Sequence, residues 1–466
     1  MRVAHVPFTF YPDPIGGTEI YVETLADGLK SCGIEPVIFA PSSNNENHSY
    51  DYNGLRVRRY RMAPTSDNML RELYGEGDPT AAREFGQILD EECPDAVHLH
   101  AFTRGVSLLT VRAAKQRGIP VFFTYHTPTV SCQRGTLMMW GREICDGILN
   151  VRRCTACSLE GRGVPRPAAA LVSAVPALVG RALETANLHG GVWTALRTPG
   201  LMQLRHETFR SLMREIDGVV ALTEWVRAIL LRNGVPGDKI ILSRHGLRHV
   251  KGTIRPLIEV DKEPLRVAFL GRAHKDKGAD TLIRALRTAP ELPIELHLYG
   301  LTQSPADQEY WNALRREAAN DNRIAFLPPI PNGEVVSLLK DYHLLAVPSR
   351  WLETGPLVVL ESLAAGTPVI GSNLGGIAEW VRHEDNGLLV SPEDHQAWAD
   401  AFRRCASDRG LVSKLRQRVE MPRSMADVAH EMALLYRRHG ISDERSCSTR
   451  ETSLYNRIPP APNQLV

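Results

Sequence analysis

The stretch Ser349–Ile370 decides the fold that we expect for the second half of the chain, and it reads S-R-W-L-E-T-G-P-L-V-V-L-E-S-L-A-A-G-T-P-V-I. Pro356 suits the first position of a helix, because the N–H that it lacks would have no partner there. One of the two residues before it would cap the helix, and Gly366 would end it. The stretch therefore predicts a loop, a helix over about residues 357–365 and a buried strand after it.

Two glutamates stand eight residues apart around the start of this helix. Glu353 lies in the loop ahead of the helix, and Glu361 lies on its second turn. The free N–H groups of the first turn point between them, and such a helix start binds phosphate. A carboxylate accepts hydrogen bonds from neighbouring hydroxyls. The arrangement suits a ligand with hydroxyls at both ends and phosphate between them, which is a nucleotide sugar. The alternative is a helix with two merely solvated glutamates.

This stretch closely resembles the E-x7-E motif of retaining GT-B glycosyltransferases, in particular the large GT4 family (glycosyl transferases group 1). The family signature also continues into the A-A-G-T-P-V-I that follows here. The resemblance covers nearly all of residues 1–440. It implies that Glu353 is a catalytic residue that contacts the sugar hydroxyls, and that Glu361 binds the ribose. It also implies that the start of the helix, at Gly355, Pro356 and Leu357, lies against the donor phosphates.

The length and composition exclude several classes of protein. A chain of 466 residues exceeds a single core and predicts two domains. Its 55 Lys and Arg against 53 Asp and Glu give no basic field, so we expect no nucleic-acid partner. The N-terminus reads as a strand without a signal peptide, and no stretch has the apolar length of a membrane span. We therefore expect a cytoplasmic protein, or one at the inner face of the cell membrane.

Strand-like runs alternate with amphipathic helical stretches in both halves of the chain. This alternation predicts parallel sheets with helices on both faces. Together with the family resemblance, it gives an α/β fold class: a GT-B fold of two Rossmann-like, doubly wound domains that face a cleft. The strands are predicted at Val3–Pro7, Pro36–Ala40, Asp95–Leu99, Val121–Tyr125, Gly218–Leu222, Leu265–Leu270, Ile294–Tyr299, Ile324–Leu327, Leu344–Val347 and Pro368–Ile370.

The organisation along the chain follows from breaks in this alternation. The predicted segments are an acceptor-side domain at 1–247 with a cysteine-bearing insertion at about 127–200, a linker at 248–264, a nucleotide-sugar-binding domain at 265–421, a crossover helix at 422–439 that returns to the first domain, and a tail at 440–466. The tail is polar, contains proline and has no period, so we expect it to be disordered.

A glycine pair follows the first predicted strand. Gly16 and Gly17 precede Thr18, which would cap the next helix, so the backbone there would lie open to an anion. GT4 proteins commonly have two glycines at this place, and the resemblance implies contact with the donor phosphate or the acceptor. The alternative is a turn that serves only packing.

Two cations flank the turn after the first strand of the second domain. Arg272 and Lys277 are similar to the arginine and lysine with which the family holds the donor diphosphate. They would neutralise the pyrophosphate and stabilise the charge that builds on it as the glycosidic bond breaks. The alternative is a pair of solvated loop cations.

Three histidines end strands of the first domain. His126 follows the apolar run Val121–Tyr125, and the family resemblance implies a catalytic contact with the donor sugar near the reacting carbon. His98 and His100 alternate with Leu99 and so share one face of their strand. We expect a structural role for His98 and, at most, an outer-cleft role for His100.

Two positions depart from the family pattern. The Asn-Gly-Val that often ends the first domain is replaced by Arg244-His245-Gly246-Leu247, which keeps only the glycine of the turn. The usual Pro-Phe-Gly order after the first glutamate is replaced by Gly355-Pro356. Loop contacts with the sugar are therefore expected to differ here.

Four of the eight cysteines fall in one segment as C-x12-C-x8-C-x2-C. Thiolates with one C-x2-C pair suit a structural Zn²⁺, and an Fe–S cluster is compatible as well. Independent buried thiols are the alternative reading of this spacing. The clustering in a segment of little apolar content favours a metal site, whose ligands would be Cys132, Cys145, Cys154 and Cys157.

These patterns predict an enzyme that moves a sugar from a nucleoside-diphosphate sugar to a saccharide or lipid-linked acceptor with retention, in surface polysaccharide or glycolipid biosynthesis. The family resemblance implies chemistry without a catalytic metal. One alternative is a nucleotide-sugar epimerase or another GT-B enzyme, which shares the phosphate-binding parts. Another is a catalytically inactive sugar-binding protein.

The apolar run Ala168–Leu183 carries Arg166 and Arg181 near its ends. Such a segment is able to lie on a membrane surface without crossing it. Peripheral membrane contact is therefore one expectation, and packing against the cysteine-bearing insertion or a partner subunit is the other.

Overall fold

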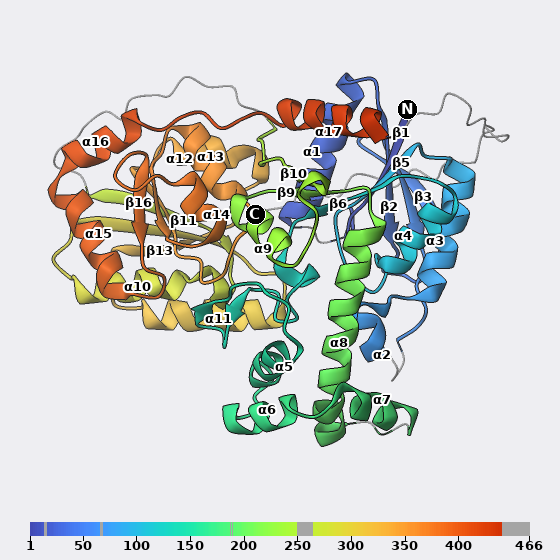
Figure 1. Ribbon diagram of the computed structural model, residues 1–466. Coiled ribbons are helices and arrows are strands. Elements are labelled where there is room, and N and C mark those ends of the chain that lie inside the picture. Colours follow the sequence, from blue (N-terminus) through green and yellow to red (C-terminus); the bar gives the residue numbers. More distant parts are fainter. Residues whose placement is uncertain (14–15, 66–68, 187, 189, 249–263, 440–466) are drawn as a thin grey trace. The chain divides into compact units, whose positions relative to one another are not determined.

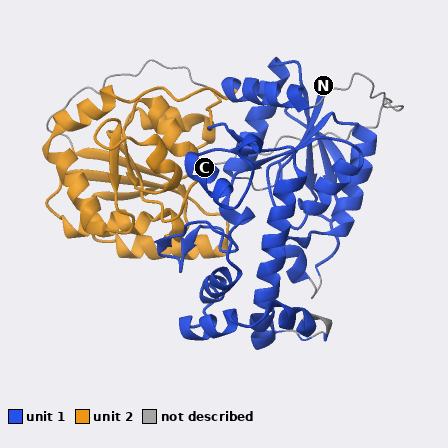
Figure 2. Ribbon diagram, viewed as in Figure 1, with its two compact units in different colours: residues 1–244, 426–460 blue, residues 245–425, 461–466 orange. Residues whose placement is uncertain are grey.

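The computed structural model describes residues 1–439 except 14–15, 66–68, 187, 189 and 249–263. Within these residues the chain forms two compact units (Figure 2). Unit 1 holds Met1–Arg244 together with the helix that follows Met425, and unit 2 holds the residues from His245 to Met425. The predicted linker, apart from its two ends, and the predicted tail lie outside the described residues.

The described part of unit 1 is built on an eight-stranded sheet in the order β10-β9-β6-β5-β1-β2-β4-β3 (Figure 1). Its neighbouring strands pair in parallel except β3 with β4. The strands are β1 (Arg2–Val6), β2 (Glu35–Pro41), β3 (His48–Tyr52), β4 (Leu55–Tyr60), β5 (Ala96–Leu99), β6 (Val121–Tyr125), β9 (Gly218–Ala221) and β10 (Ile240–Leu242). The helices are α1 (Gly17–Ser31), α2 (Met69–Arg71), α3 (Pro79–Glu92), α4 (Leu108–Gln116), α5 (Val151–Glu160), α6 (Arg166–Ser173), α7 (Ala177–Thr185), α8 (Gly191–Glu215), α9 (Glu224–Arg232) and α17 (Met425–His439).

The described part of unit 2 is built on a fully parallel six-stranded sheet in the order β13-β12-β11-β14-β15-β16. Its strands are β11 (Leu265–Arg272), β12 (Ile294–Leu301), β13 (Ile324–Leu327), β14 (Leu344–Val347), β15 (Val369–Ser372) and β16 (Gly387–Val390). Its helices are α10 (Ala279–Thr288), α11 (Pro305–Glu317), α12 (Val335–Leu339), α13 (Leu357–Ala365), α14 (Gly375–Trp380), α15 (His395–Ser407) and α16 (Arg409–Gln417).

The sheet of unit 2 is buried on both faces. Val267 and Phe269 of β11 belong to one apolar core, whereas Ala268 and Leu270 belong to another. Successive side chains of a strand point to opposite faces, so a strand covered on both sides reads as a continuous apolar run. This is why the strands of the second half were predictable from the sequence, and the α/β fold class is confirmed.

In both sheets, the direction in which the chain adds strands reverses at a strand in the middle. The chain builds outward from β11 through β12 to β13, then returns to the other side of β11 with β14, β15 and β16. Unit 1 does the same from β1, with β2 on one side and β5 on the other. In such sheets ligands bind outside the carboxyl ends of the strands at this switch point. The switch points are therefore the places where functional side chains are expected.

The ten predicted strands are present, and β3, β4, β10 and β16 of the two large sheets were not predicted, nor were the two short strands β7 (Met138–Met139) and β8 (Glu143–Ile144). The antiparallel pair of β3 and β4 lies at a sheet edge, and its sequences, HSYDY and LRVRRY, carry many polar residues. An edge strand does not need apolar side chains on both faces, so its sequence lacks the signal that marks the buried strands.

The segment between β6 and β9 departs from the strand–helix alternation. It contains a two-stranded ribbon of β7 (Met138–Met139) and β8 (Glu143–Ile144), then α5 to α7, and finally the long helix α8, which leads to β9. Helices α7 and α8 approach closely where Gly180 faces Gly200. The insertion predicted at about 127–200 thus ends inside α8, since that helix continues to Glu215.

The helix α17 belongs to unit 1 from Ala426 onward. Its Tyr436 is buried, and the phenol oxygen lies 2.6 Å from Nδ1 of His98 on β5. Ser243 Oγ at the end of β10 donates a hydrogen bond of 2.6 Å to Glu431. These contacts fix the C-terminal helix on the sheet that the first half of the chain builds.

Candidate active site

The switch point of unit 2 brings together the loops that follow β11 and β14. Arg350, just after β14, donates its backbone N–H to the carbonyl of Asp276 in the turn after β11, at 2.8 Å. Gly278 ends that turn with φ of +73°, and a Cβ there would lie 2.1 Å from the carbonyl oxygen of Pro348. Only glycine allows this close approach. The two loops are therefore held side by side by the backbone itself.

Glu353 lies in the loop after β14 and is 6% exposed. Its Oε1 accepts hydrogen bonds from Lys277 Nζ at 2.7 Å, from Ser349 Oγ at 2.5 Å and from Trp351 Nε1 at 3.1 Å. A buried carboxylate is stable only when it is paired and hydrogen-bonded. The sequence-predicted pair of Glu353 and Lys277, which are 76 residues apart, is thus joined in one ion pair.

The two predicted phosphate-binding cations are held differently. Lys277 sits on a 3-10 turn, Lys275–Lys277, and its Nζ also lies 5.5 Å from the ring centre of Trp351. Arg272 ends β11 with an exposed side chain, and its Nε is 3.9 Å from a carboxylate oxygen of Asp307. At that distance the pairing is weak. Arg272 therefore keeps most of its guanidinium donors available for a ligand.

Glu361 stands on the second turn of α13 and is partly buried. Burial raises the pKa of its carboxyl to about 7. No hydrogen bond or ion pair joins Glu361 to any other part of the chain that the structure describes. An unpaired carboxylate that is costly to ionise is typical of a binding or catalytic position.

The start of α13 differs by one residue from the prediction. Pro356 is the capping residue and the helix begins at Leu357, instead of Pro356 being its first residue. The predicted end is confirmed, because Gly366 closes the helix in the left-handed conformation. A Cβ on Gly355 would lie 2.1 Å from the ring of the buried His245, so this glycine lets the loop pack onto that ring.

The turn after β1 also differs from the prediction. Gly16 caps α1 and Gly17 is its first residue, whereas Thr18 was expected to be the cap. The carboxylate of Glu19 accepts a hydrogen bond of 2.9 Å from the N–H of Gly16. A side-chain carboxylate thus already takes one of the donors that a helix start offers to an anion.

A chain of histidines lies at the switch point of unit 1. His5 Nδ1 lies 3.0 Å from Nε2 of His100, and His100 Nδ1 lies 3.0 Å from Nε2 of His126. All three are buried, as is His98, which contacts Thr124 at 2.7 Å and Tyr436. The outer-cleft position expected for His100 is therefore wrong: the histidine is buried because both ring nitrogens bond to other rings.

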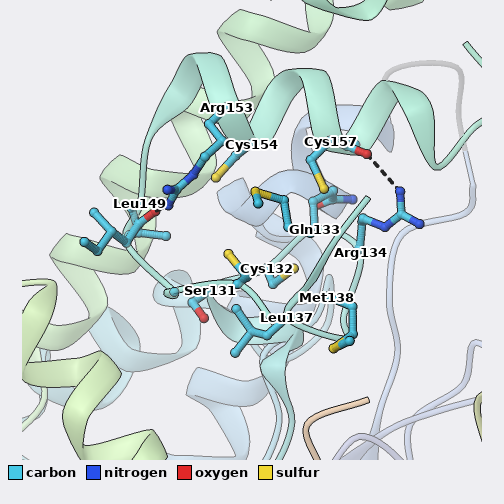
Figure 3. Close-up of a pocket in the computed structure, with 15 residues that line it drawn as sticks. Ser131, Cys132, Gln133, Arg134, Leu137, Met138, Leu149, Arg153, Cys154 and Cys157 are labelled. Carbon is cyan, nitrogen blue, oxygen red and sulfur yellow. Dashed lines mark hydrogen bonds between the residues drawn. The ribbon is translucent and has the colours of Figure 1, made fainter. Parts of the chain in front are cut away.

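The four clustered cysteines line one pocket of unit 1. Cys154 and Cys157 lie one helical turn apart on α5, Cys132 follows a short 3-10 turn after β6, and Cys145 follows β8. Figure 3 shows the sulfur atoms of Cys132, Cys154 and Cys157 directed toward the same space. All four are free thiols.

Some residues around these sites were not predicted. Ser349 and Trp351 bond Glu353, and Gly376 at the start of α14 donates its N–H to the carbonyl of Glu353 at 2.7 Å. The adjacent glycines in the sequence L-G-G after β15 were a signal for this contact. His5 lacked any signal, because a histidine inside an apolar strand gives no hint of its neighbours in the sheet.

Comparison with protein families assigns both halves of the chain. Residues 16–244 match the model described as "Glycosyl transferase 4-like domain", and residues 250–421 match the one described as "Glycosyl transferases group 1". The chain belongs to the group 1 glycosyltransferases. Unit 2 thus corresponds to the part that carries the E-x7-E motif.

Relatives and solved structures agree with this family. The chain is 26% identical over 409 residues to a D-inositol 3-phosphate glycosyltransferase from Xylanimonas cellulosilytica, covering 86% of this chain and 85% of that protein. Matches to proteins of the same name from Corynebacterium species span only about a third to a half of those proteins' length.

Two solved structures share the fold. Sucrose-phosphate synthase from Thermosynechococcus elongatus is similar with a TM-score of 0.64 and 21% identity, over 94% of this chain and 98% of that one. HepE from Anabaena, solved in complex with UDP-glucose, gives a TM-score of 0.61 and 14% identity, over 94% and 100%. The GT-B fold expected from the sequence is thereby confirmed.

Proposed function

We propose that this protein is a retaining glycosyltransferase that moves a sugar from a nucleoside-diphosphate sugar to a saccharide or lipid-linked acceptor. The observation that carries the proposal is the Lys277–Glu353 ion pair at the switch point of unit 2, followed by the unpaired Glu361 on α13. The first carboxylate, the cation with the helix start, and the second carboxylate match the sugar, the diphosphate and the ribose of a nucleotide sugar in turn.

In this proposal the diphosphate is held by Arg272, Lys277 and the N–H groups at the start of α13. Arg272 has an exposed guanidinium, and Lys277 Nζ is directed into the site by Glu353. Gly355, Pro356 and Leu357 bring the backbone close to the phosphates, with Gly355 packed on His245. These positive groups stabilise the charge that develops on the leaving diphosphate.

The two glutamates bind the two sugars of the donor. Glu353 has its Oε1 occupied by three donors, which fixes the carboxylate for hydrogen bonds to the transferred sugar. Glu361 accepts hydrogen bonds from the ribose hydroxyls. The residue-specific roles rest on the family motif and on the arrangement of these side chains.

Retention follows from attack on the face that the diphosphate leaves. The acceptor hydroxyl bonds to the anomeric carbon as the bond to the diphosphate breaks, and an oxygen of the leaving phosphate takes the hydroxyl proton. No side chain of this chain is then needed as a general base. His126, fixed by His100 and by an edge-to-face contact with Tyr21 at 4.8 Å, contacts the donor sugar. Gly16 and Gly17 contact the acceptor or the phosphate.

The donor class is supported by HepE, whose structure was solved with UDP-glucose. The sugar and base of the donor used here are open to direct test. We expect the acceptor to belong to a surface polysaccharide or glycolipid pathway, and the reaction to occur in the cytoplasm or at the inner face of the membrane.

Turnover of labelled donors tests this function. Each nucleotide sugar is incubated with and without saccharide acceptors, and the anomeric configuration of the product is read by NMR. Transfer with retention supports the proposal. Isomerisation of the donor without an acceptor would favour an epimerase, and binding without any turnover would favour an inactive sugar-binding protein.

Peripheral membrane contact belongs to the same proposal. No helix in the described part of the chain is long and apolar enough to span a membrane. The predicted apolar run is split into α6 and α7, and one face of α6 packs against α5 through Ala169 and Val172. Three apolar side chains of helices α6, α7 and α8 are each more than 70% accessible: Leu171, Leu178 and Val192.

These exposed apolar side chains, together with the half-exposed Arg166 of α6 and Arg181 of α7, suit an anionic lipid surface. Co-sedimentation with anionic liposomes tests the contact. We expect Leu171→Asp with Leu178→Asp to abolish binding, while equal sedimentation of the wild-type and variant proteins would contradict it.

A further inference from the structure

The cysteine pocket of unit 1 has the features of a metal site that the transfer reaction does not use. Its cysteines come from three separate pieces of chain: Cys132 after β6, Cys145 after β8, and Cys154 with Cys157 on α5. The space between the lining residues is about 470 Å³, part of it open to solvent. The only strands next to it in the described part of the insertion, β7 and β8, have two residues each.

Backbone hydrogen bonds are directed at the sulfur atoms. The N–H of Trp140 lies 3.3 Å from Sγ of Cys157. Burial raises the pKa of the Cys145 and Cys154 thiols, and backbone groups of Gly147 and Asn150 bond these two sulfurs as well. Donors to sulfur are a poor match for neutral thiols but are the usual surroundings of metal-bound thiolates.

A buried cation lies close to the pocket. Arg205 on α8 is 5% exposed, and its Nε has no hydrogen-bond partner in the described part of the chain. Its guanidinium interacts electrostatically with Cys132 and Cys154. An isolated buried guanidinium is costly unless a negative group compensates it. Four thiolates around a divalent ion or a cluster of charge +2 carry a net charge of about −2, which provides that compensation.

We propose that Cys132, Cys145, Cys154 and Cys157 bind a four-thiolate metal centre. It joins the loop after β6 to α5 and so fixes the chain that leaves His126, six residues before Cys132. This loop is also held by Tyr125, whose hydroxyl lies 2.6 Å from Ser131 Oγ. The role of the centre is to hold the insertion in place, because metal-binding energy becomes folding energy where the ligands come from separate segments.

The separation of the sulfurs bears on which metal is bound. In the described part of the chain, no three of these four sulfur atoms lie within 4.8 Å of one another. A single tetrahedral Zn²⁺ with bonds of about 2.3 Å holds its sulfurs about 3.8 Å apart. A [4Fe–4S] cluster binds each of its four cysteines through a different iron and so keeps their sulfurs farther apart. The geometry therefore favours a cluster over a single zinc ion.

Elemental analysis of the full chain tests the proposal. The protein is purified without chelator and without oxygen, and zinc, iron and acid-labile sulfide are measured per chain together with the absorption spectrum. Iron and sulfide in similar amounts with a broad band near the blue end of the visible spectrum identify a cluster. One equivalent of zinc identifies a zinc centre and means that the sulfurs close on the ion. Either result supports the metal centre, and less than about one tenth of an equivalent of both metals would overturn it.

Variants locate the metal on the cysteines. We expect Cys154→Ser and Cys157→Ser to lose at least four fifths of the bound metal, and Cys32→Ser, a free thiol elsewhere in unit 1, to keep it. Limited proteolysis provides a readout that does not depend on a variant's metal content: chelator treatment of the wild-type protein should expose cleavage sites between residues 131 and 158. Unchanged metal in both α5 variants would overturn the assignment to this pocket.

Discussion

The two units carry different kinds of side chain at their switch points, although both sheets have a switch point in the middle. At the switch point of unit 2, Arg272, Lys277 and Glu353 are charged, and the ion pair directs the lysine. At the switch point of unit 1, His5 and His100 are buried rings bonded to one another, and burial lowers the pKa of His5 to about 3. One switch point thus carries charged side chains, and the other carries buried rings that stay neutral.

This difference indicates how the work is divided. The leaving diphosphate gains charge in the reaction, so the groups that stabilise it must be cationic and fixed beforehand. The reacting sugar carries hydroxyls and no charge, and neutral imidazoles bond hydroxyls without the cost of burying an ion. Substitutions in unit 2 should therefore change donor binding and turnover, whereas substitutions of His5, His98 and His100, which lie behind His126, should mainly change stability.

The largest effect is expected for Lys277→Ala. Loss of a preorganised cation at the leaving group should lower kcat by about 10²- to 10³-fold. It also leaves Glu353 without its ion-pair partner. Initial rates at saturating donor measure the change. Lys275→Ala is the control, because this neighbouring lysine contributes only its backbone carbonyl to the turn.

A loss of activity in the Lys275 variant equal to that in the Lys277 variant would mean that general positive charge, and not the placed cation, is what matters.

A smaller effect is expected for Glu361→Ala. Removing a carboxylate that accepts hydrogen bonds from the ribose should weaken donor binding by about 10- to 100-fold, with kcat at saturation little changed. Calorimetric titration with the nucleotide sugar gives the dissociation constant. Glu309→Ala, an exposed glutamate on α11, serves as the matched control. Equal dissociation constants for the wild type and the Glu361 variant would exclude the ribose contact.

The pH dependence of donor binding tests the contact between Glu361 and the ribose in a second way. Burial gives Glu361 a pKa of about 7, so the ionised form that binds the ribose becomes dominant between pH 6 and 8. Donor affinity should rise by about tenfold over this range. The diphosphate of a nucleotide sugar stays ionised throughout. In Glu361→Gln the rise should disappear, and a rise that persists in this variant would assign the titration to another group.

The free energy of unfolding should fall as pH rises, whereas donor affinity should rise. The folded chain keeps a proton on Glu361 that the unfolded chain releases near pH 4.5, so the folded state binds more protons between about pH 4.5 and 7. The free energy of unfolding of the ligand-free protein therefore falls as pH rises through this window, by an amount that Glu361→Gln should remove. Thermal melts of the wild type and of Glu361→Gln at the two ends of this pH window measure the difference in the free energy of unfolding.

The smallest effect on function is expected for His98→Ala. The variant loses the contacts of His98 with Tyr436 and Thr124, which costs about 1–3 kcal/mol of the free energy of unfolding. Donor affinity should stay within twofold of wild type. Thermal melts and titrations measure both, with the exposed His48→Ala as the control. A large loss of donor affinity without loss of stability would contradict the division between the units.

Sequence patterns predicted the parts of the molecule in which local chemistry repeats. The buried strands of both sheets are recognisable in the sequence as apolar runs, and Gly366 marks the end of α13. Edge strands β3 and β4 carry no such signal. The pairing of Lys277 with Glu353 was expected only as a shared site, because the sequence does not show that Gly278 lets the two loops touch.

Contacts between distant strands could not be read from the sequence. His98 and His100 were expected on one face of their strand, but His5 lies far from them in the sequence, and only the register of β1 beside β5 brings it to them. The cap of α1 was assigned to Thr18 because threonine is a good capping residue, whereas Gly16 adopts the required extended backbone and Glu19 supplies the bond.

The central claim is that unit 2 holds the nucleotide sugar through Lys277 and Glu361. A thermal-shift panel of UDP-, GDP-, ADP- and TDP-sugars tests it most directly, since a ligand that binds only the folded chain raises the melting temperature as it saturates. We predict that sugars of one nucleoside raise it by several degrees in the wild type and in the Lys275→Ala and Glu309→Ala controls, but by less than one degree in the double variant Lys277→Ala with Glu361→Ala. An equal shift in that double variant, or no shift with any donor in the wild type, would contradict the account.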